Sequence, residues 1–262
     1  MDRLKDKVTL ITGGGSGIGK VSGQLFAREG SKIVVLEINP ALGEAAAADV
    51  KKQGGDAFFV QADVTNEASV NAAVEKAIGK YSRIDVLFNC AGGSARDDAP
   101  VTEVDLALFN QTMNLDVLGT MLASRHVIPS MIANNSGSVI NVATWGAFRG
   151  ANPKHVYTAA KGAIVSLTRA MAGEYAKNGI RVNAIAPGVV RTERSIRNHE
   201  NPGTRVAVDR PSKEVREYMK ATYPFSIGEP IDIANIALFL ASSESRMVTA
   251  ATIMADGGRS AY

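Results

Sequence analysis

The chain of 262 residues has very few of the residues that build disulfide and metal sites. It contains one cysteine, Cys90, and three histidines that are widely separated in the sequence. A single cysteine excludes an internal disulfide framework and agrees with a reducing compartment. Because no cluster of cysteine and histidine exists, we expect no metal site.

Long apolar runs and a strong charge bias are also missing. The apolar stretch VTLI near the N-terminus is far too short for a signal peptide or a membrane span, and no other run approaches a span. The 29 basic and 26 acidic residues leave a net charge of +3, and aromatic residues make up only 6 %. We therefore expect a cytoplasmic protein with a small-molecule partner that binds neither nucleic acid nor a membrane.

Short runs rich in β-branched residues alternate with helical patterns along the whole chain. The runs are solidly apolar, as in strands that are buried on both faces. Their alternation with helices predicts one α/β domain over residues 1–262, a doubly wound parallel sheet of about seven strands with helices on both faces. The predicted strands are 7–12, 32–37, 57–62, 84–89, 137–143, 180–186 and 252–256, and the predicted helices are 18–29, 40–53, 66–80, 103–133, 155–177 and 230–241.

Residues 188–229 interrupt this alternation. The segment holds about forty residues with a single helical pattern, SKEVREYMKATY at 212–223. It follows a strand end, which is where open α/β sheets place their ligands. We expect a substrate loop or lid.

A glycine-rich turn, TGGGSGIG at 12–19, follows the first predicted strand and opens the first helix. Residue 18 is isoleucine, so the spacing is not G-x-G-x-x-G but T-G-x-x-x-G-x-G with Gly13, Gly17 and Gly19. Glycines let the backbone approach a pyrophosphate, and a helix N-terminus favours anions. A turn that needs glycine only for its geometry is the alternative, but the context favours a Rossmann-type dinucleotide site.

An acidic residue, Glu37, ends the second predicted strand 20 residues after Gly17. That spacing is typical of the carboxylate that binds the adenosine ribose hydroxyls. A carboxylate there would repel a 2′-phosphate, so the sequence favours NAD over NADP as the cofactor.

The segment YTAAK places Tyr157 and Lys161 four residues apart in a predicted helix, on one face. A free tyrosine is a poor base at neutral pH, and a nearby ammonium lowers its pKa. Such a pair also occurs by chance on helix surfaces. It indicates a catalytic function here only because a dinucleotide motif precedes it in the chain.

Five motifs occur in order: TGGGSGIG, NCAG at 89–92, Asn114 in MNLDVLGT, YTAAK, and PGVVRT at 187–192. With them the chain resembles the short-chain dehydrogenase/reductases in their compact form, over essentially its whole length. Two departures stand out. Cys90 replaces an asparagine usual in the family, and NVAT at 141–144 replaces Asn-x-Ser-Ser. Thr144 lies thirteen residues before Tyr157, where the family has its catalytic serine.

The resemblance implies an NAD-dependent oxidoreductase that interconverts a secondary alcohol and a ketone by hydride transfer. It implies Tyr157 as acid and base, Lys161 as the residue that tunes it, Thr144 as the ligand of the substrate oxygen, and Asn114 as the helix-kink residue of the proton relay. The cofactor would also contact Tyr157 and Lys161, and the implied cofactor-binding set is completed by Gly13, Ser16, Gly17, Ile18, Gly19, Glu37, Asp63, Val64, Asn89, Ala91, Gly92, Pro187, Gly188, Val190 and Thr192. The family commonly forms homotetramers through its long helices, here 103–133 and 155–177.

The sequence says less about the substrate. By resemblance, the substrate cavity would be lined by Ser94, Trp145, Phe148, Arg149, His155, Val189 and Arg194. The basic residues after position 190 predict either an anionic substrate or a solvated lid, and charged runs usually face water. His155 is a substrate contact or a structural histidine.

Two further functions are compatible with the motifs. One is an NADPH-dependent 3-oxoacyl-(acyl carrier protein) reductase, against which Glu37 argues. The other is a cofactor-binding regulator without turnover, supported only by the missing serine.

Overall fold

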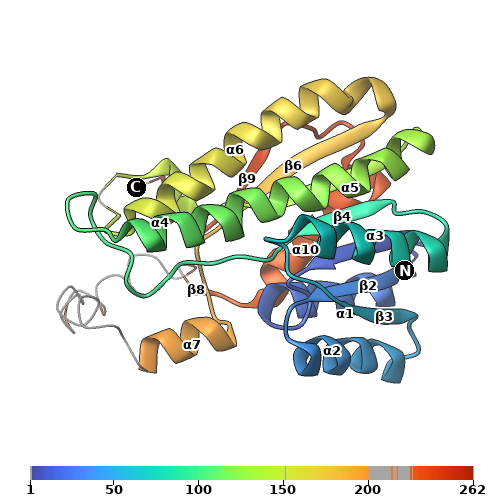
Figure 1. Ribbon diagram of the computed structural model, residues 1–262, viewed down its shortest axis with the longest axis horizontal. Coiled ribbons are helices and arrows are strands. Elements are labelled where there is room, and N and C mark those ends of the chain that lie inside the picture. Colours follow the sequence, from blue (N-terminus) through green and yellow to red (C-terminus); the bar gives the residue numbers. More distant parts are fainter. Residues whose placement is uncertain are drawn as a thin grey trace.

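A parallel sheet forms the centre of the protein, as the sequence predicts (Figure 1). The computed structural model describes residues 2–150, 152–200, 214, 217, 225 and 227–261. Within those residues the sheet has seven strands in the order β3-β2-β1-β4-β5-β6-β9. The strands are β1 (Val8–Thr12), β2 (Lys32–Glu37), β3 (Ala57–Gln61), β4 (Val86–Asn89), β5 (Gly137–Val142), β6 (Ile180–Pro187) and β9 (Thr252–Ala255).

Helices cover both faces of the sheet, which explains why its central strands are mostly apolar. All residues of β1 and β4 are buried. One core cluster joins the sheet to α3, α5 and α6, and the other joins it to α1, α2 and α10. The helices are α1 (Gly17–Arg28), α2 (Pro40–Lys52), α3 (Glu67–Tyr81), α4 (Leu106–Thr112), α5 (Gly119–Ala133), α6 (His155–Tyr175), α7 (Glu193–Glu200) and α10 (Pro230–Ala241).

The long helix predicted at 103–133 has a different internal structure. It begins at Leu106, and between α4 and α5 it widens into a π-helical segment, Met113–Leu118. Short π-helical segments of this kind are frequent at functional sites. The widened turn changes which side chains point toward the sheet, with consequences for the site below.

The carboxyl ends of the strands meet at one edge of the sheet. In the sheet, β2 and β3 lie on one side of β1, and β4, β5, β6 and β9 lie on the other. The strand order therefore changes direction at β1. Ligands of open α/β sheets bind in the crevice at such a reversal. The glycine turn after β1 and Thr144 after β5 both lie at this edge.

The segment predicted as a lid is described only in part. After β6 the chain forms β7 (Val189–Val190), which pairs with β8 (Ile227–Gly228), and then α7. The helix predicted at 212–223 lies outside the described residues apart from Glu214 and Glu217. Among the helices that are described, none is long and apolar enough to cross a membrane.

Candidate active site

Tyr157 and Lys161 lie in the first turns of α6, at the carboxyl edge of the sheet. The Lys161 side chain is only 4 % exposed, and its Nζ lies 5.8 Å from the centroid of the Tyr157 ring. The same Nζ donates a 2.8 Å hydrogen bond to the carbonyl oxygen of Val142, the last residue of β5. The ammonium is therefore fixed to the sheet beside the phenol.

Thr144 completes this group from the end of β5. It is the residue before the 3-10 helix Trp145–Phe148, and its hydroxyl accepts a 3.4 Å bond from the backbone N–H of Gly146. The hydroxyl also lies close enough to the Tyr157 phenol to lower its pKa. The threonine is buried, so this hydroxyl is held in place at the phenol. The structure thus brings together three of the four residues expected to be catalytic.

The ionisation of Tyr157 is set by opposing effects. Burial raises the pKa of Tyr157 above its ordinary value, because it disfavours the charged phenolate. The Lys161 ammonium and the Thr144 hydroxyl act in the opposite direction. Burial alone would lower the pKa of Lys161, but the carboxylate of Asp116 raises it, so the amine is held as an ammonium.

The fourth residue of the group is Asp116, where the sequence led us to expect Asn114. The Asn114 side chain is exposed, and within the described residues it makes no side-chain hydrogen bond. Asp116 is completely buried, and its Oδ1 lies 2.8 Å from Lys161 Nζ. Asn114 was expected because the motif resembles the family's; the π-helical segment turns the residue two positions later toward Lys161 instead.

Helical spacing could have indicated Asp116. Asp116, Thr120 and Ser124 follow one another at intervals of four and are all buried. The Thr120 hydroxyl donates to the Asp116 carbonyl, and the Ser124 hydroxyl to the Thr120 carbonyl. A polar stripe of this kind in an otherwise apolar helix indicates the side that faces the site, and Asn114 is not part of it.

The glycine turn has the geometry of an anion-binding loop. Gly13 and Gly17 have φ angles of 64° and 50°, and a Cβ on Gly19 would lie 2.3 Å from the Gly13 carbonyl oxygen. The backbone N–H of Gly17, at the start of α1, donates a 3.2 Å bond to the carboxylate of Glu193. A negatively charged group thus already rests where a pyrophosphate would be bound. Ser16 and Ile18 flank Gly17 in the same turn.

Glu37 is fixed beside this turn. Its Oε2 accepts a 3.2 Å bond from Gly15, and its Oε1 accepts from the N–H groups of Ile38 and Asn39. A Cβ on Gly15 would lie 2.8 Å from the Glu37 side chain. The glycine cradle and the adjacent carboxylate fit the phosphates and a ribose of a dinucleotide.

The segment NCAG continues from β4. The Asn89 side chain is buried, and its amide nitrogen donates to Asn141 Oδ1 (2.9 Å) and Ser124 Oγ (3.2 Å) in an internal polar network. The N–H groups of Cys90 and Ala91 both donate to the Thr12 hydroxyl. Burial raises the pKa of the Cys90 thiol to about 12, which makes it unreactive.

The remaining expected cofactor residues lie at the same edge of the sheet. Asp63 accepts from the N–H and the hydroxyl of Thr65, and Val64 packs into the core. Pro187 ends β6, and Gly188 comes so close to Asp256 that a Cβ there would lie 2.8 Å from its Cα. The structure also places Val190 in the core and Thr192 against Gly17.

The expected substrate residues have varied surroundings. Two guanidinium groups lie near the Trp145 ring, Arg149 at 5.5 Å and Arg259 at 4.7 Å from its centroid. Lys154 donates to the Ser94 hydroxyl, and His155 Nδ1 accepts from the N–H of Val101, which gives this histidine a structural bond.

Three further members of this set are more open. Phe148 and Val189 are 43 % and 40 % exposed. Arg194 extends from α7 to the Gly92 carbonyl and faces Tyr157. In the part of the chain that is described, no group of three or more potential metal ligands occurs.

Comparison with known proteins gives consistent matches over the whole length. The profile of the family described as Enoyl-(Acyl carrier protein) reductase matches residues 13–260. The chain is 36 % identical to 2-(S)-hydroxypropyl-CoM dehydrogenase 3 of Xanthobacter autotrophicus (99 % of each chain) and 35 % identical to levodione reductase of Leifsonia aquatica (99 % of this chain, 96 % of that one).

Solved structures agree with these relatives. A crystal structure of levodione reductase superposes with a TM-score of 0.89 at 33 % identity over 99 % of both chains. A 7α-hydroxysteroid dehydrogenase in complex with NADH and 7-oxo glycochenodeoxycholic acid superposes with a TM-score of 0.87 at 31 % identity, over 98 % of this chain and 95 % of that one.

The glycine turn leads to a prediction about stability. Gly19→Ala should lower the free energy of unfolding by about 1–3 kcal/mol, because the new Cβ meets the Gly13 carbonyl, which is backbone and cannot rotate away. Gly79→Ala in α3 is the matched control, since a Cβ there meets nothing within 4 Å and should stabilise the protein by about 0.5–1 kcal/mol. Urea unfolding measures both, and equal effects would contradict the packing described for the turn.

Proposed function

The chain belongs to the short-chain dehydrogenase/reductase family, and from that premise we propose that it is an NAD-dependent enzyme with Tyr157 as its acid and base. It is an oxidoreductase that interconverts an alcohol and a ketone. The observation that supports the site most strongly is the cluster of half-buried Tyr157 with buried Lys161 and Thr144 at the carboxyl edge of the sheet.

The side chains of this cluster have distinct tasks in the proposed mechanism. Thr144 binds the substrate oxygen through its hydroxyl and orients it toward Tyr157. In oxidation the Tyr157 phenolate removes the hydroxyl proton, and in reduction the phenol returns it to the forming alkoxide. Lys161 stabilises the phenolate electrostatically from its fixed position on α6.

The glycine turn and Glu37 are the residues that would hold the cofactor. When bound, the nicotinamide supplies or accepts the hydride. The backbone of Gly13–Gly19 and the N-terminus of α1 would hold the pyrophosphate, and Glu37 would accept hydrogen bonds from the adenosine ribose. Since Glu37 is anchored by three backbone N–H groups, its charge is fixed where a 2′-phosphate would lie, which supports NAD.

The substrate class is proposed from the relatives and the walls of the site. One relative is by its name a reductase of levodione, and another is a dehydrogenase of 2-(S)-hydroxypropyl-CoM. Trp145, with two arginine guanidinium groups near its ring, follows directly after Thr144 and offers an aromatic wall. We therefore propose a small secondary alcohol or its ketone as the substrate, and cyclic diones with the matching hydroxy ketones as the first compounds to assay.

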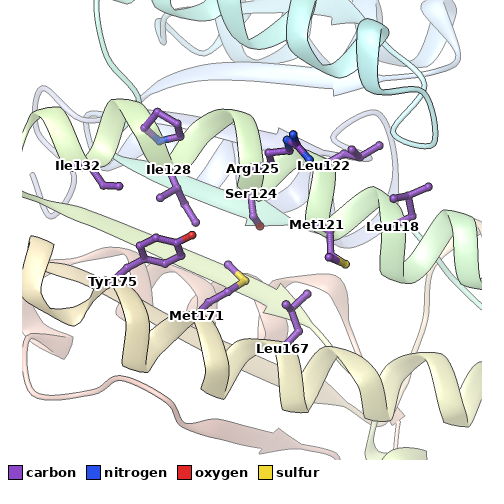
Figure 2. Close-up of a pocket in the computed structure, with 11 residues that line it drawn as sticks. Leu118, Met121, Leu122, Ser124, Arg125, Ile128, Ile132, Leu167, Met171 and Tyr175 are labelled. Atoms are coloured by element: carbon purple, nitrogen blue, oxygen red, sulfur yellow. The ribbon is translucent and has the colours of Figure 1, made fainter.

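A groove between α5 and α6 supports the expected assembly of copies of the chain. Figure 2 shows Met121, Ser124 and Ile128 of α5 directed toward α6, whose Leu167, Met171 and Tyr175 face them across the groove. Among them, Leu118, Met121 and Ile132 are 37 %, 48 % and 36 % exposed, a large apolar content for the surface of an isolated chain. We propose that a second copy covers this face, as part of a homotetramer.

Two substitutions at Thr144 and one at Tyr157 test the mechanism. Tyr157→Phe should lower kcat by about 10²–10⁴, because the acid and base is lost. Thr144→Ser should keep most of the activity, and Thr144→Val should lose most of it, because valine keeps the shape and removes the hydroxyl. NADH absorbance at 340 nm follows the reaction. Full turnover by Tyr157→Phe, or equal activity of the two Thr144 variants, would contradict the proposal.

The cofactor preference depends on the charge of Glu37. Glu37→Gln should raise the ratio of kcat/KM for NADP over NAD by about tenfold or more, a change worth about 1.4 kcal/mol. Glu44→Gln, an exposed position in the neighbouring α2, is the matched control and should leave the ratio unchanged. An unchanged ratio in Glu37→Gln would favour the 3-oxoacyl reductase alternative.

The proposed assembly can be tested by charge insertion. Met121→Glu should reduce the mass measured by light scattering, because it places a carboxylate in the apolar groove. Leu42→Glu is the matched control, with similar exposure (42 %) on α2, and should leave the mass unchanged. A stable monomer of the unmodified protein would overturn the proposal.

A further inference from the structure

Asp116 is a buried carboxylate in direct contact with the machinery proposed above. Its exposure is 0 %, and its Oδ1 is shared between Lys161 Nζ at 2.8 Å and the backbone N–H of Gly93 at 3.1 Å. Its other oxygen, Oδ2, is buried and has no hydrogen-bond partner in the described part of the chain. Desolvating a carboxylate is costly, so its presence here calls for a compensating partner, and Lys161 is that partner.

We propose that Asp116 is a positioning residue that holds Lys161 in a buried ion pair and so sets the pH range in which Tyr157 works as acid and base. The inference rests on the proposed role of Tyr157. The proposal differs from the role expected of Asn114 in two respects: Asp116 is a different residue, and it carries a negative charge.

The negative charge of Asp116 weakens the effect of Lys161 on the ionisation of Tyr157. An ammonium beside a phenol favours the phenolate, and a carboxylate 2.8 Å from that ammonium cancels much of its field. Three effects, given from the largest to the smallest, act on the pKa of Tyr157: burial raises it, Lys161 lowers it, and Asp116 raises it. The carboxylate therefore shifts the ionisation of the phenol toward alkaline pH.

Other polar groups around Tyr157 do not replace this effect. Arg194 from α7 and the Thr144 hydroxyl favour the phenolate. The Cys90 thiol after β4 faces Lys161 and stays protonated near neutral pH, because burial raises its pKa to about 12. Asp98 accepts from the backbone N–H groups of Val156 and Tyr157 at the start of α6. Asp116 is the carboxylate that acts on the phenol through Lys161.

The surrounding backbone is fitted to Asp116. Gly92 has a φ of 137°, and a Cβ on it would lie 2.2 Å from Asp116 Oδ1 and 3.4 Å from Lys161 Nζ. The next residue, Gly93, has a φ of 138° and donates its N–H to the same oxygen. Gly92, in a conformation that other residues rarely adopt, thus leaves room for the carboxylate, and Gly93 donates to it. This arrangement fixes Asp116 and Lys161 relative to each other.

Asp116→Asn tests the proposal, because it keeps the shape and removes the charge. The amide oxygen of the variant and the Val142 carbonyl still accept from the Lys161 ammonium, while the negative charge that offsets its field is gone. The pKa of Tyr157 should therefore fall by about one unit, which raises the phenolate fraction near pH 7 about tenfold. Carbon-13 NMR of cofactor-free protein with labelled tyrosine Cζ follows the titration, and Tyr157→Phe assigns the signal. The pH dependence of kcat/KM for alcohol oxidation should move to lower pH by a similar amount.

Asn114→Ala is the matched control on the same π-helical segment, and it should leave both titrations in place. An unchanged or higher Tyr157 pKa in folded Asp116→Asn would overturn the inference, as would a shift in Asn114→Ala. If Asp116→Asn does not fold, Asp116→Ser is measured against the same expectation. Failure of the proposed function is distinguishable, since Tyr157→Phe would then keep its turnover whatever the NMR titration shows.

Discussion

A buried ammonium is the constraint on which the site depends. Lys161 is 4 % exposed, and the Asp116 carboxylate and the Val142 carbonyl both receive hydrogen bonds from its ammonium. These partners come from the π-helical segment and from β5, so the ammonium joins a helix to the sheet. The position of Tyr157, one turn earlier in α6, follows from the same attachment. The chemistry proposed for Tyr157 thus depends on how this one charge is compensated.

Most of the fold could be predicted from the sequence because its signals are local. The apolar runs indicate seven strands, and the structure confirms them in parallel order, with β1 and β4 buried throughout. The glycine turn after β1 and the four-residue spacing of Tyr157 and Lys161 are equally local. Thr144 was found by its distance from Tyr157, and the structure places its hydroxyl at the phenol.

Other features depend on tertiary structure that no local pattern encodes. Asn114 was expected at the site, but the π-helical turn directs Asp116 there. No local pattern indicates that the Asn89 amide joins Asn141 in an interior network that links β4 to β5. For His155 two roles were open, and the structure gives its Nδ1 a bond to the backbone of a distant loop. In each case the partner is far away in the sequence.

A crystal structure of the protein with its dinucleotide bound tests the central claim most directly. The account predicts that Lys161 Nζ lies within hydrogen-bonding distance of Asp116 Oδ1, with Asp116 buried and the Asn114 side chain directed away from Tyr157. An Asn114 side chain in contact with Lys161 or with the site, together with Asp116 turned toward solvent, would contradict it.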